Sequence, residues 1–493
     1  MITFSGALLL LLAGYFIYGL LVEKVFGADK NKATPCYTHA DGVDFIPMPT
    51  WKVFLIQFLN IAGTGPIFGA ILGVLYGPAA YLWIVLGCIF GGAVHDYLSG
   101  MISIRKGGVG LAEIIGDELG SVARLAMRVF TLLLMVMVGT VFVTSPAGLL
   151  SNMIGADHWW GTTLFWTIII FLYYVLATLL PIDKLIGKIY PVFGIALLSM
   201  AVGLLWGIFS QSGTMPEITE AFTNHNPDSL ALPLFPGLFI TIACGAVSGF
   251  HATQSPMMAR CMKNEKYGRP VFYGSMITEG IVALIWAAAT VKFADSLPGE
   301  GQTAYEKLLA AMTTDKGAVP AIMVNQICNS WLGSVGAVLA ILGVVAAPIT
   351  SGDTAFRSGR LIAADFLHFK QGKLLNRLLV AVPLFVISFI LMQVNFQRLW
   401  NYFGWLNQSL SVFTFWAITV WLASRRKCFY LALVPALWMT LVCTQYILIA
   451  PIGFSLLPDV AIWISGGVCL VALLLFIRSL RGMSRQVSAQ KPD

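Results

Sequence analysis

Charged residues are scarce in this sequence. Only 11% of its 493 residues are Asp, Glu, Lys or Arg, whereas 58% are hydrophobic and the mean hydropathy is +0.82. Soluble folds do not use such a mixture, because about a quarter of their residues are charged. Apolar runs of about 18 or more residues recur along the chain, and each is long enough to cross a hydrocarbon core about 30 Å thick. We therefore predict an all-α, polytopic membrane protein.

The motifs of soluble enzymes are also missing. The sequence contains no P-loop, no HExxH and no nucleophile elbow. Its eight cysteines are scattered without a CxxC pair, which indicates free thiols and neither a disulfide framework nor a zinc knuckle. The net charge of +7 fits contact with anionic lipids and not nucleic acid. We expect no catalytic residues, no cofactor and no bound metal.

Thirteen apolar runs are candidate membrane spans. They cover residues 2–22, 53–76, 78–99, 122–147, 162–180, 188–210, 232–258, 271–294, 331–352, 374–394, 398–424, 428–450 and 460–480. Lysine and arginine are enriched in cytoplasmic loops, and here they fall in alternate loops except for Lys292, Lys307, Lys316 and Arg398. This asymmetry predicts an N-terminus outside and a C-terminus in the cytoplasm. The first run lacks a basic leader and a cleavage site, so we expect it to remain as a helix.

The span 53–76 carries the segment AGTGP in its middle. Glycine costs about 1 kcal/mol in a helix interior and proline about 3 kcal/mol, so this segment should divide the span into two half-helices. In the hydrocarbon region, the backbone groups freed by such a break must be buried in protein or line a wet cavity. Broken helices are the usual place where transporters hold a substrate or an ion.

A second interrupted span, 232–258, contains Gly245, Ser248, Gly249 and Pro256. It lies five spans after the first, so the two segments should cross the membrane in opposite directions. Short amphipathic pieces, LAEIIGDELG and TAYEKLLAAM, follow at matching places. We therefore predict a LeuT-like 5+5 inverted repeat with extra flanking helices. Its parts are an N-terminal helix and loop (1–52), a first repeat (53–210), a second repeat (211–424), two C-terminal helices (425–485) and a disordered tail (486–493).

The two breaks together predict a binding site for a small nutrient. Its candidate residues are Asn60, Gly63, Thr64, Gly65, Ser248, His251 and Gln254. The half-helix that follows Pro66 could hold a carboxylate through unpaired N–H groups and the helix dipole. For His251, lining the cavity is favoured over the role of a satisfied core histidine.

Ionisable side chains inside a membrane are costly, so three of them are candidates for coupling transport to an ion. His95 and Asp96 are adjacent near the inner end of the third span, and Glu279 occupies the equivalent neighbourhood in the eighth. A neutral imidazole beside a carboxylate could relay a proton, because histidine titrates near physiological pH. The alternative for His95 and Asp96 is a structural pair that hydrogen-bonds a loop. The alternative for Glu279 is a buried acid that is hydrogen-bonded to a neighbouring hydroxyl.

The segment ITSGDTAFRSGR offers a second kind of ion site near the inner end of the ninth span. Thr350 and Ser351 could supply oxygen ligands to Na⁺, as hydroxyl pairs facing an unwound helix do in LeuT-type carriers. The preferred interpretation is an inner gate in which Asp353 pairs with Arg357 or Arg360. An Asp/Arg pair four residues apart is also ordinary helix electrostatics.

Several long segments resemble the carbon starvation protein A (CstA) family. They are ADGVDFIPMP at 40–49, NIAGTGPIFGAILGVLYGP at 60–78, GCIFGGAVHDYLSGMISIRKGG at 87–108, GFHATQSPMMARC at 249–261 and APITSGDTAFRSGR at 347–360. The resemblance implies an APC-type, LeuT-like secondary carrier that takes up nutrients during starvation. It implies peptides as the substrate of some members and pyruvate, with proton symport, as that of others. This chain looks shorter than the long members of the family, and the resemblance establishes no role for His95, Asp96 or His251.

These observations predict a secondary active transporter that imports peptides or a pyruvate-like monocarboxylate. The expected partners are that nutrient, a coupling cation and membrane lipids, and not nucleic acid. H⁺ is the favoured cation and Na⁺ the alternative, and a homo-oligomer is compatible with the sequence. A channel or a nutrient sensor without coupled transport is the alternative function, although a channel would need a ring of subunits and a filter.

Overall fold

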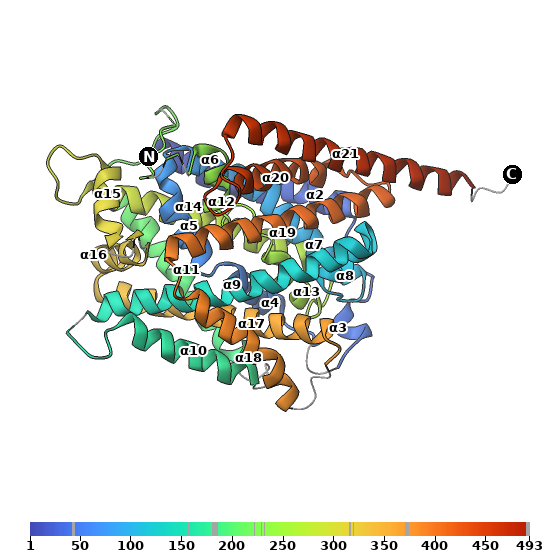
Figure 1. Cartoon of the computed structure of the whole chain (residues 1–493), viewed down its shortest axis with the longest axis horizontal. Helices are drawn as coiled ribbons and strands as arrows, with labels where there is room; N and C mark the ends of the chain where they lie inside the picture. Colours follow the sequence, from blue (N-terminus) through green and yellow to red (C-terminus); the bar gives the residue numbers. More distant parts are fainter. Residues whose placement is uncertain are drawn as a thin grey trace.

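The structure is a computed structural model and describes residues 1–489, except 42–44, 156, 180–185, 221, 228, 231, 315–316, 319 and 370–373. Helices dominate it, as the composition predicted (Figure 1). Short 3₁₀ or π turns are labelled η. The elements of the first half are α1 (Ile2–Ala13), η1 (Gly14–Tyr18), α2 (Gly19–Phe26), α3 (Pro35–Thr38), α4 (Thr50–Ile61), α5 (Thr64–Gly73), η2 (Val74–Tyr76), α6 (Ala79–Leu86), η3 (Gly87–Gly92), α7 (Ala93–Arg105), α8 (Leu111–Leu119), α9 (Ser121–Ile154), α10 (Thr163–Leu179) and α11 (Ile186–Ser210).

The second half continues with the same architecture and adds one small hairpin. Its elements are α12 (Leu234–Thr241), α13 (His251–Ala259), η4 (Glu265–Tyr267), η5 (Arg269–Tyr273), α14 (Gly274–Asp295), α15 (Ala304–Met312), β1 (Thr313–Thr314), β2 (Gly317–Ala318), α16 (Pro320–Ala340), η6 (Ile341–Val345), α17 (Ala346–Phe366), α18 (Leu374–Leu391), α19 (Phe396–Ser424), α20 (Tyr430–Ile449) and α21 (Pro458–Ala489). The strands β1 and β2 pair antiparallel. The last four residues of the predicted tail lie outside the described residues.

Every predicted span contains helix. Among the described residues, nine helical stretches are long and apolar enough to cross a membrane, and the pair α4 and α5 adds a bent one. The predicted ranges 162–180 and 374–394 match the shorter apolar helices α10 and α18. The predicted range 232–258 is divided between α12 and α13. The chain is therefore an all-α polytopic membrane protein.

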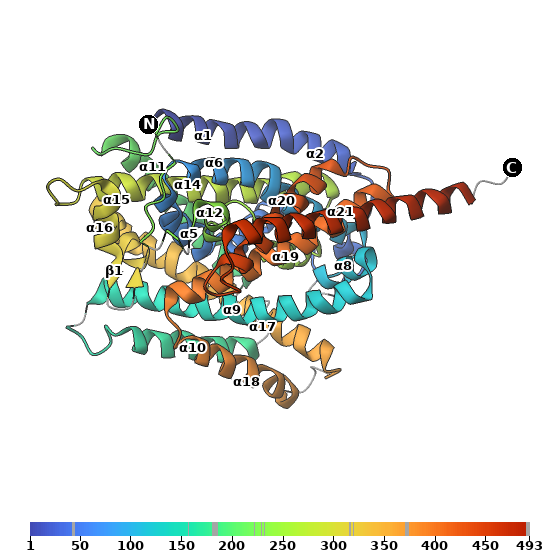
Figure 2. The same cartoon turned by 45° about the horizontal axis from the view of Figure 1, so that its top comes forward.

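Burial orders the helices from the centre outward. The apolar helix α14 is buried on all sides, as expected of a helix that is hydrophobic all round. By contrast, only 28% of the α1–α2 stretch and 17% of α21 are buried, and both lie along the outside of the molecule (Figure 2). Their exposed apolar side chains are what a lipid-facing helix presents.

Four helices pack on one another at one side of the molecule: α9, α10, α17 and α18, which we call the α9 group (Figure 1). Its internal hydrogen bonds are specific. The Tyr174 hydroxyl contacts the carbonyl oxygens of Phe142 at 2.9 Å and Pro348 at 3.2 Å, and Thr140 Oγ1 lies 2.8 Å from Ser388 Oγ. The helices α4, α5, α6, α7, α12, α13 and α14 pack together beside it, and we call them the broken-helix group.

Candidate functional site

The first break lies where the glycines and the proline predicted it. The helix α4 ends at Ile61, α5 begins at Thr64, and the two are bent by 47°. Pro66 lies in the first turn of α5, where a missing N–H has no partner to lose. AGTGP therefore ends one helix and begins another.

The second break covers residues 242–250, between α12 and α13, and we call it the link. It starts before the predicted polar segment, and Pro256 lies inside α13 and not in the break. Gly245 adopts a positive φ of 91°, which a side chain would strain, and a Cβ there would lie 2.6 Å from that of Ala283. Gly245 is thus the residue that lets the link pass close to α14.

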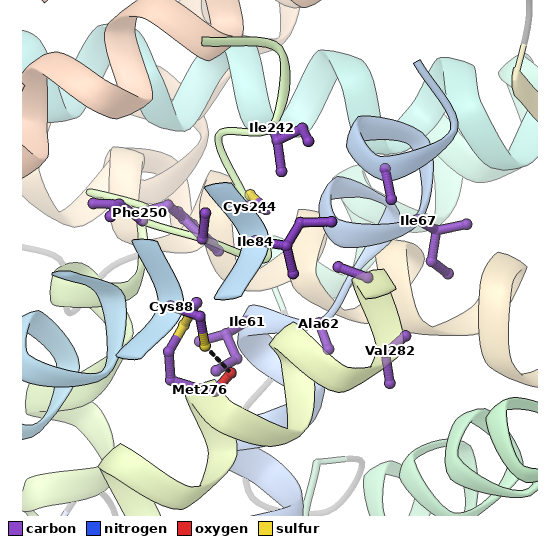
Figure 3. Packing of buried hydrophobic residues seen from close by; sticks show 14 of the residues in the cluster. Ile61, Ala62, Ile67, Ile84, Cys88, Ile242, Cys244, Phe250, Met276 and Val282 are labelled. Carbon is purple, nitrogen blue, oxygen red and sulfur yellow. Dashed lines mark hydrogen bonds between the residues drawn. The ribbon is translucent and has the colours of Figure 1, made fainter. Parts of the chain in front are cut away.

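The two broken segments lie against each other. Gln57 Nε2 of α4 donates to Ser255 Oγ of α13 at 3.3 Å. Further along, a Cβ on Gly65 would lie 2.5 Å from Cys244 Sγ, so the absence of a side chain permits this approach. Residue numbers rise along one segment while they fall along the other, so the segments run antiparallel, as predicted. Figure 3 shows Cys244 and Ile242 of the link beside the helix α5, which carries Ile67.

A chain of buried ionisable groups connects three helices beside the link. Asp96 of α7 lies at its centre: Oδ1 is 2.9 Å from His95 Nδ1, and Oδ2 is 3.0 Å from His251 Nδ1 at the start of α13. The opposite nitrogen of His251, Nε2, lies 3.5 Å from Glu279 Oε2 of α14. Glu279 Oε1 accepts the backbone N–H of Gly245 at 3.0 Å, which ties the chain to the link.

This chain is fully enclosed, since His95, Asp96, His251 and Glu279 are all 0% exposed. His251 Nε2 and Glu279 Oε2 form no hydrogen bond among the described residues, although their distance suits an ion pair. A buried carboxylate without a donor is costly, and a proton on His251 would give Glu279 an opposite charge while Asp96 keeps its own bond. The group can therefore store one proton at His251.

Polar atoms without partners gather at the breaks. Asn60 Oδ1, Thr64 Oγ1 and Gln254 Oε1 are buried and accept or donate no hydrogen bond among the described residues. Unpaired buried polar atoms are unusual in native structures, so each of them calls for a ligand or an ordered water. Gly63 packs close to a ring instead: a Cβ there would lie 3.1 Å from Cζ of Phe142.

Asn407 of α19 belongs to the site, although the sequence interpretation missed it. Its Oδ1 accepts the backbone N–H of Phe250 at 2.7 Å and lies 3.1 Å from Ser248 Oγ. The side chain thereby holds the end of the link and the start of α13. The sequence signal for it is the polar pair Asn407-Gln408 inside the apolar run 398–424, although neither side chain is ionisable.

The residues of the ninth span are separate from this chain. The helix that carries Thr350 and Asp353 extends beyond residue 352, the predicted end of the ninth span, because α17 continues to Phe366. Its hydroxyls bond inside the helix: Thr350 Oγ1 and Ser351 Oγ both donate to Ala347 O, at 2.7 and 3.1 Å. Such back-bonding lets hydroxyl residues continue a helix.

Two contacts made by α17 match the predicted alternatives in part. Asp353 Oδ1 and Arg357 Nη2 lie 3.8 Å apart as a pair four residues apart, and Arg357 Nη2 also donates to Ala177 O at 2.8 Å. Ser351 Oγ also lies 3.4 Å from the carbonyl oxygen of Leu59 near the end of α4. This hydroxyl therefore contacts the last turn of α4, next to the first break.

Cys244, His251 and Glu279 offer a thiol, an imidazole and a carboxylate whose nearest atoms all lie within 4.8 Å of one another. His251 and Glu279 each use one polar atom in the bonds to Asp96 and Gly245, so each keeps one polar atom that could meet a ligand.

A family model described as "Carbon starvation protein CstA" matches residues 1–157 and 145–312. The chain belongs to the CstA family. The matched residues include both breaks and the chain from His95 to Glu279, whereas Asn407 and the ninth-span residues lie beyond them.

Three relatives of this CstA family member are each similar over little more than half of the chain. An uncharacterized membrane protein of Haemophilus influenzae is 45% identical, covering 59% of this chain and 91% of its own. The peptide transporter CstA of Campylobacter jejuni is 30% identical over 57% of this chain and 48% of its own. The pyruvate/proton symporter BtsT of Escherichia coli is 28% identical over 56% of this chain and 46% of its own. The chain thus spans about half the length of the last two.

A solved structure shares the fold of this CstA family member. The manganese transporter of Eremococcus coleocola superposes with a TM-score of 0.54, covering 90% of this chain and 99% of its own. The sequences are only 14% identical, so the similarity concerns the fold alone.

Proposed function

We propose that the chain is a secondary active transporter that imports a small nutrient across the bacterial inner membrane, coupled to a cation gradient. The observation that carries this proposal is the buried chain Asp96–His251–Glu279, which is bonded to the link at Gly245. A broken helix that shares hydrogen bonds with a group able to hold one proton couples a charge to the shape of a binding site. The family membership and the names of the relatives support the same function.

The nutrient is a peptide or a pyruvate-like monocarboxylate, bound between the two breaks. A carboxylate would accept hydrogen bonds from the unpaired N–H groups at the start of α5, where Thr64 and Gly65 lie. The helix dipole also favours a negative charge there. Asn60, Ser248 and Gln254 would contact the rest of the nutrient, while Gly63 and Gly65 let the first break pack closely against Phe142 and Cys244. Uptake of such nutrients suits a response to carbon starvation.

H⁺ is the favoured cation, and His251 is its carrier. Protonated His251 can bond Asp96 and face Glu279 at once, whereas neutral His251 leaves Glu279 Oε2 without a donor and without an opposite charge. Loss of the proton therefore weakens the contact between α13 and α14 and favours movement of the link. The alternative cation is Na⁺, bound at Thr350 and Ser351. Asp353 and Arg357 would form a gate on α17. His95 would hold Asp96 in place through its hydrogen bond.

Uptake by the purified full chain in proteoliposomes tests this proposal. We expect a peptide or a monocarboxylate to accumulate above its external concentration when an inward proton gradient is imposed. An imposed sodium gradient alone should give equilibration only. Accumulation under neither gradient, for any nutrient tried, would overturn the proposal and favour a channel or a nutrient sensor without coupled transport. Thermal-shift screening across pH, with and without Na⁺, would select the nutrients to test.

The predicted orientation and repeat belong to the same proposal. We propose that the N-terminus lies outside and the C-terminus in the cytoplasm, and that residues 53–210 and 211–424 form the two inverted halves. The antiparallel contact of Gln57 with Ser255 and of Gly65 with Cys244 supports this arrangement. A cysteine-accessibility map of the loops would test it.

A further inference from the structure

An apolar groove opens between α6, η3, α12 and α20. Its volume is about 660 Å³, within the range of small-molecule sites, which is about 300–1,000 Å³. Leu86, Phe90 and Val434 line it and are 48%, 45% and 63% exposed, so the groove faces the surroundings of the protein and not its interior. In a membrane protein, those surroundings are lipid.

The link between α12 and α13 reaches the groove through one residue. Val247 of the link lines the groove together with Gly87 and Gly91 of η3. A Cβ on Gly91 would lie 2.6 Å from Val247 Cγ2, and one on Gly87 would lie 3.0 Å from Ala246 Cβ. These two glycines therefore let the link approach, and whatever fills the groove touches the segment that carries Gly245 and Ser248.

The lining favours a hydrocarbon occupant. It is made of aliphatic and aromatic side chains and contains no charged residue; its polar atoms belong to tyrosines and tryptophans such as Tyr18, Tyr430 and Trp438. A hydrophilic nutrient would lose its hydration there without gaining hydrogen bonds. The lining extends along α20 from Tyr430 to Met439, which corresponds to about 14 Å of helix.

Positive charge lies at one end of the groove. Tyr430 begins α20, and Arg425, Arg426 and Lys427 precede it in the sequence, separated from it by Cys428 and Phe429. Arg425 donates to Trp421 O and Lys427 to Val25 O, at 3.3 and 3.2 Å. Arg426 is exposed, and its guanidinium group makes no polar contact in the part of the chain that the structure describes. Juxtamembrane cations of this kind attract anionic lipid headgroups.

We propose that this groove binds one acyl chain of an anionic phospholipid, of the phosphatidylglycerol class, with its phosphate at Arg426 and its chain against Val247. The charge at one end and the hydrocarbon lining of the rest match the two parts of such a lipid. The occupied groove would support the link from the membrane side. This inference does not depend on the proposed function, because binding is measured without transport.

Photolabelling in nanodiscs tests the proposal. The full chain is placed in phosphatidylcholine nanodiscs with a phosphatidylglycerol that carries a diazirine in its acyl chain, irradiated, and mapped by peptide mass spectrometry. We expect adducts on residues 79–91 and 430–439. Val434→Trp and Leu86→Trp fill the groove and should remove most of these adducts. Leu474→Trp, at a 55% exposed position on α21 outside the groove, should leave them unchanged.

A second comparison tests the headgroup. Arg426→Gln should reduce labelling in the groove about fivefold, the factor that one cation near an anionic lipid contributes. Arg478→Gln, at an exposed arginine of α21, should not. Equal labelling by a phosphatidylcholine with the same diazirine chain, or adducts spread evenly over α1 and α21, would overturn the proposal. Absence of adducts together with dimers in native mass spectra would also overturn it, in favour of a second copy.

Discussion

His251 and Asp96 are 155 residues apart in the sequence, yet His251 Nδ1 lies 3.0 Å from Asp96 Oδ2 with both side chains fully buried. The bond joins α7 to the first residue of α13, where the second broken span resumes its helix. Any change in the charge of either group is therefore felt at the link. The chemistry of the site follows from this one contact.

Asp96→Asn should abolish coupled uptake while the protein still folds. The amide keeps one acceptor oxygen, replaces the other with an NH2 donor and removes the charge that stabilises a proton on His251, and an unpaired buried charge costs about 3–5 kcal/mol. Accumulation in proteoliposomes should fall by more than about tenfold. Asp117→Asn on α8, a partly exposed partner of Lys106 and Arg124, is the matched control and should transport normally. Wild-type accumulation by Asp96→Asn would assign Asp96 a structural role only.

Glu279→Gln should separate binding from coupling. The amide oxygen can still accept the Gly245 N–H, so the link keeps its anchor, but the carboxylate facing His251 Nε2 is lost. We expect nutrient exchange across the membrane at equal pH to continue and accumulation under a proton gradient to be lost. Counterflow and gradient-driven uptake, measured on the same vesicles, check this. Loss of both activities in a well-folded variant would place Glu279 in nutrient binding instead.

Gly65→Ala should destabilise the protein through the contact between the breaks. The new Cβ would lie 2.5 Å from Cys244 Sγ, and overpacking of this kind costs about 1–3 kcal/mol. Thermal unfolding in detergent should show a lower Tm, and Cys244→Gly should recover part of the loss in the double variant. Gly148→Ala in α9 should be neutral or slightly stabilising, because the added Cβ would have no neighbouring atom within 4 Å outside the backbone of its own helix. Additive effects of Gly65→Ala and Cys244→Gly would contradict the contact.

Asn407→Ala should loosen the link. The substitution removes the acceptor of the Phe250 N–H, and loss of a capping side chain costs about 0.5–2 kcal/mol. Hydrogen exchange at Phe250 should become faster, while Asn407→Asp, which keeps the acceptor, should restore slow exchange. Asn401→Ala on the same helix removes only a contact with Gln397 and serves as the control. Unchanged exchange at Phe250 would show that another group holds the link.

His225 should make the loop between α11 and α12 sensitive to pH. Its ring stacks on Tyr305 at 3.8 Å, and its backbone N–H donates to Leu75 O at 2.7 Å. Burial lowers the pKa of His225, against the opposing effect of Glu220 and Glu306. The undocked ring then binds a proton at a higher pH than the docked ring, so docking is fully stable above about pH 6.5 and weakens as the pH falls below it. Exchange of the His225 amide should accelerate below that pH, and in His225→Phe it should not; identical profiles would contradict the prediction.

The sequence predicted the breaks because their cause is local. Glycine and proline in AGTGP interrupt a helix whatever surrounds it, and the opposite direction of the second break followed from counting spans. The contact between Asp96 and His251 was not predictable from the sequence. The repeat relates His95 and Asp96 to Glu279 as equivalent positions in its two halves, and it does not say which side chains touch. Their convergence depends on how α7, α13 and α14 pack. The end of α17 was misplaced because its hydroxyls bond their own helix, a choice that a sequence pattern does not show.

Ser351 joins the α9 group to the broken-helix group through the carbonyl oxygen of Leu59. This carbonyl belongs to the last turn of α4, whose acceptors have lost their partners in the helix. A water molecule can replace a hydroxyl on such an acceptor at little cost. Water that enters the break would then separate the α9 group from the broken-helix group at the same time. A hydrated nutrient could supply this water to the Leu59 carbonyl oxygen in place of the Ser351 hydroxyl.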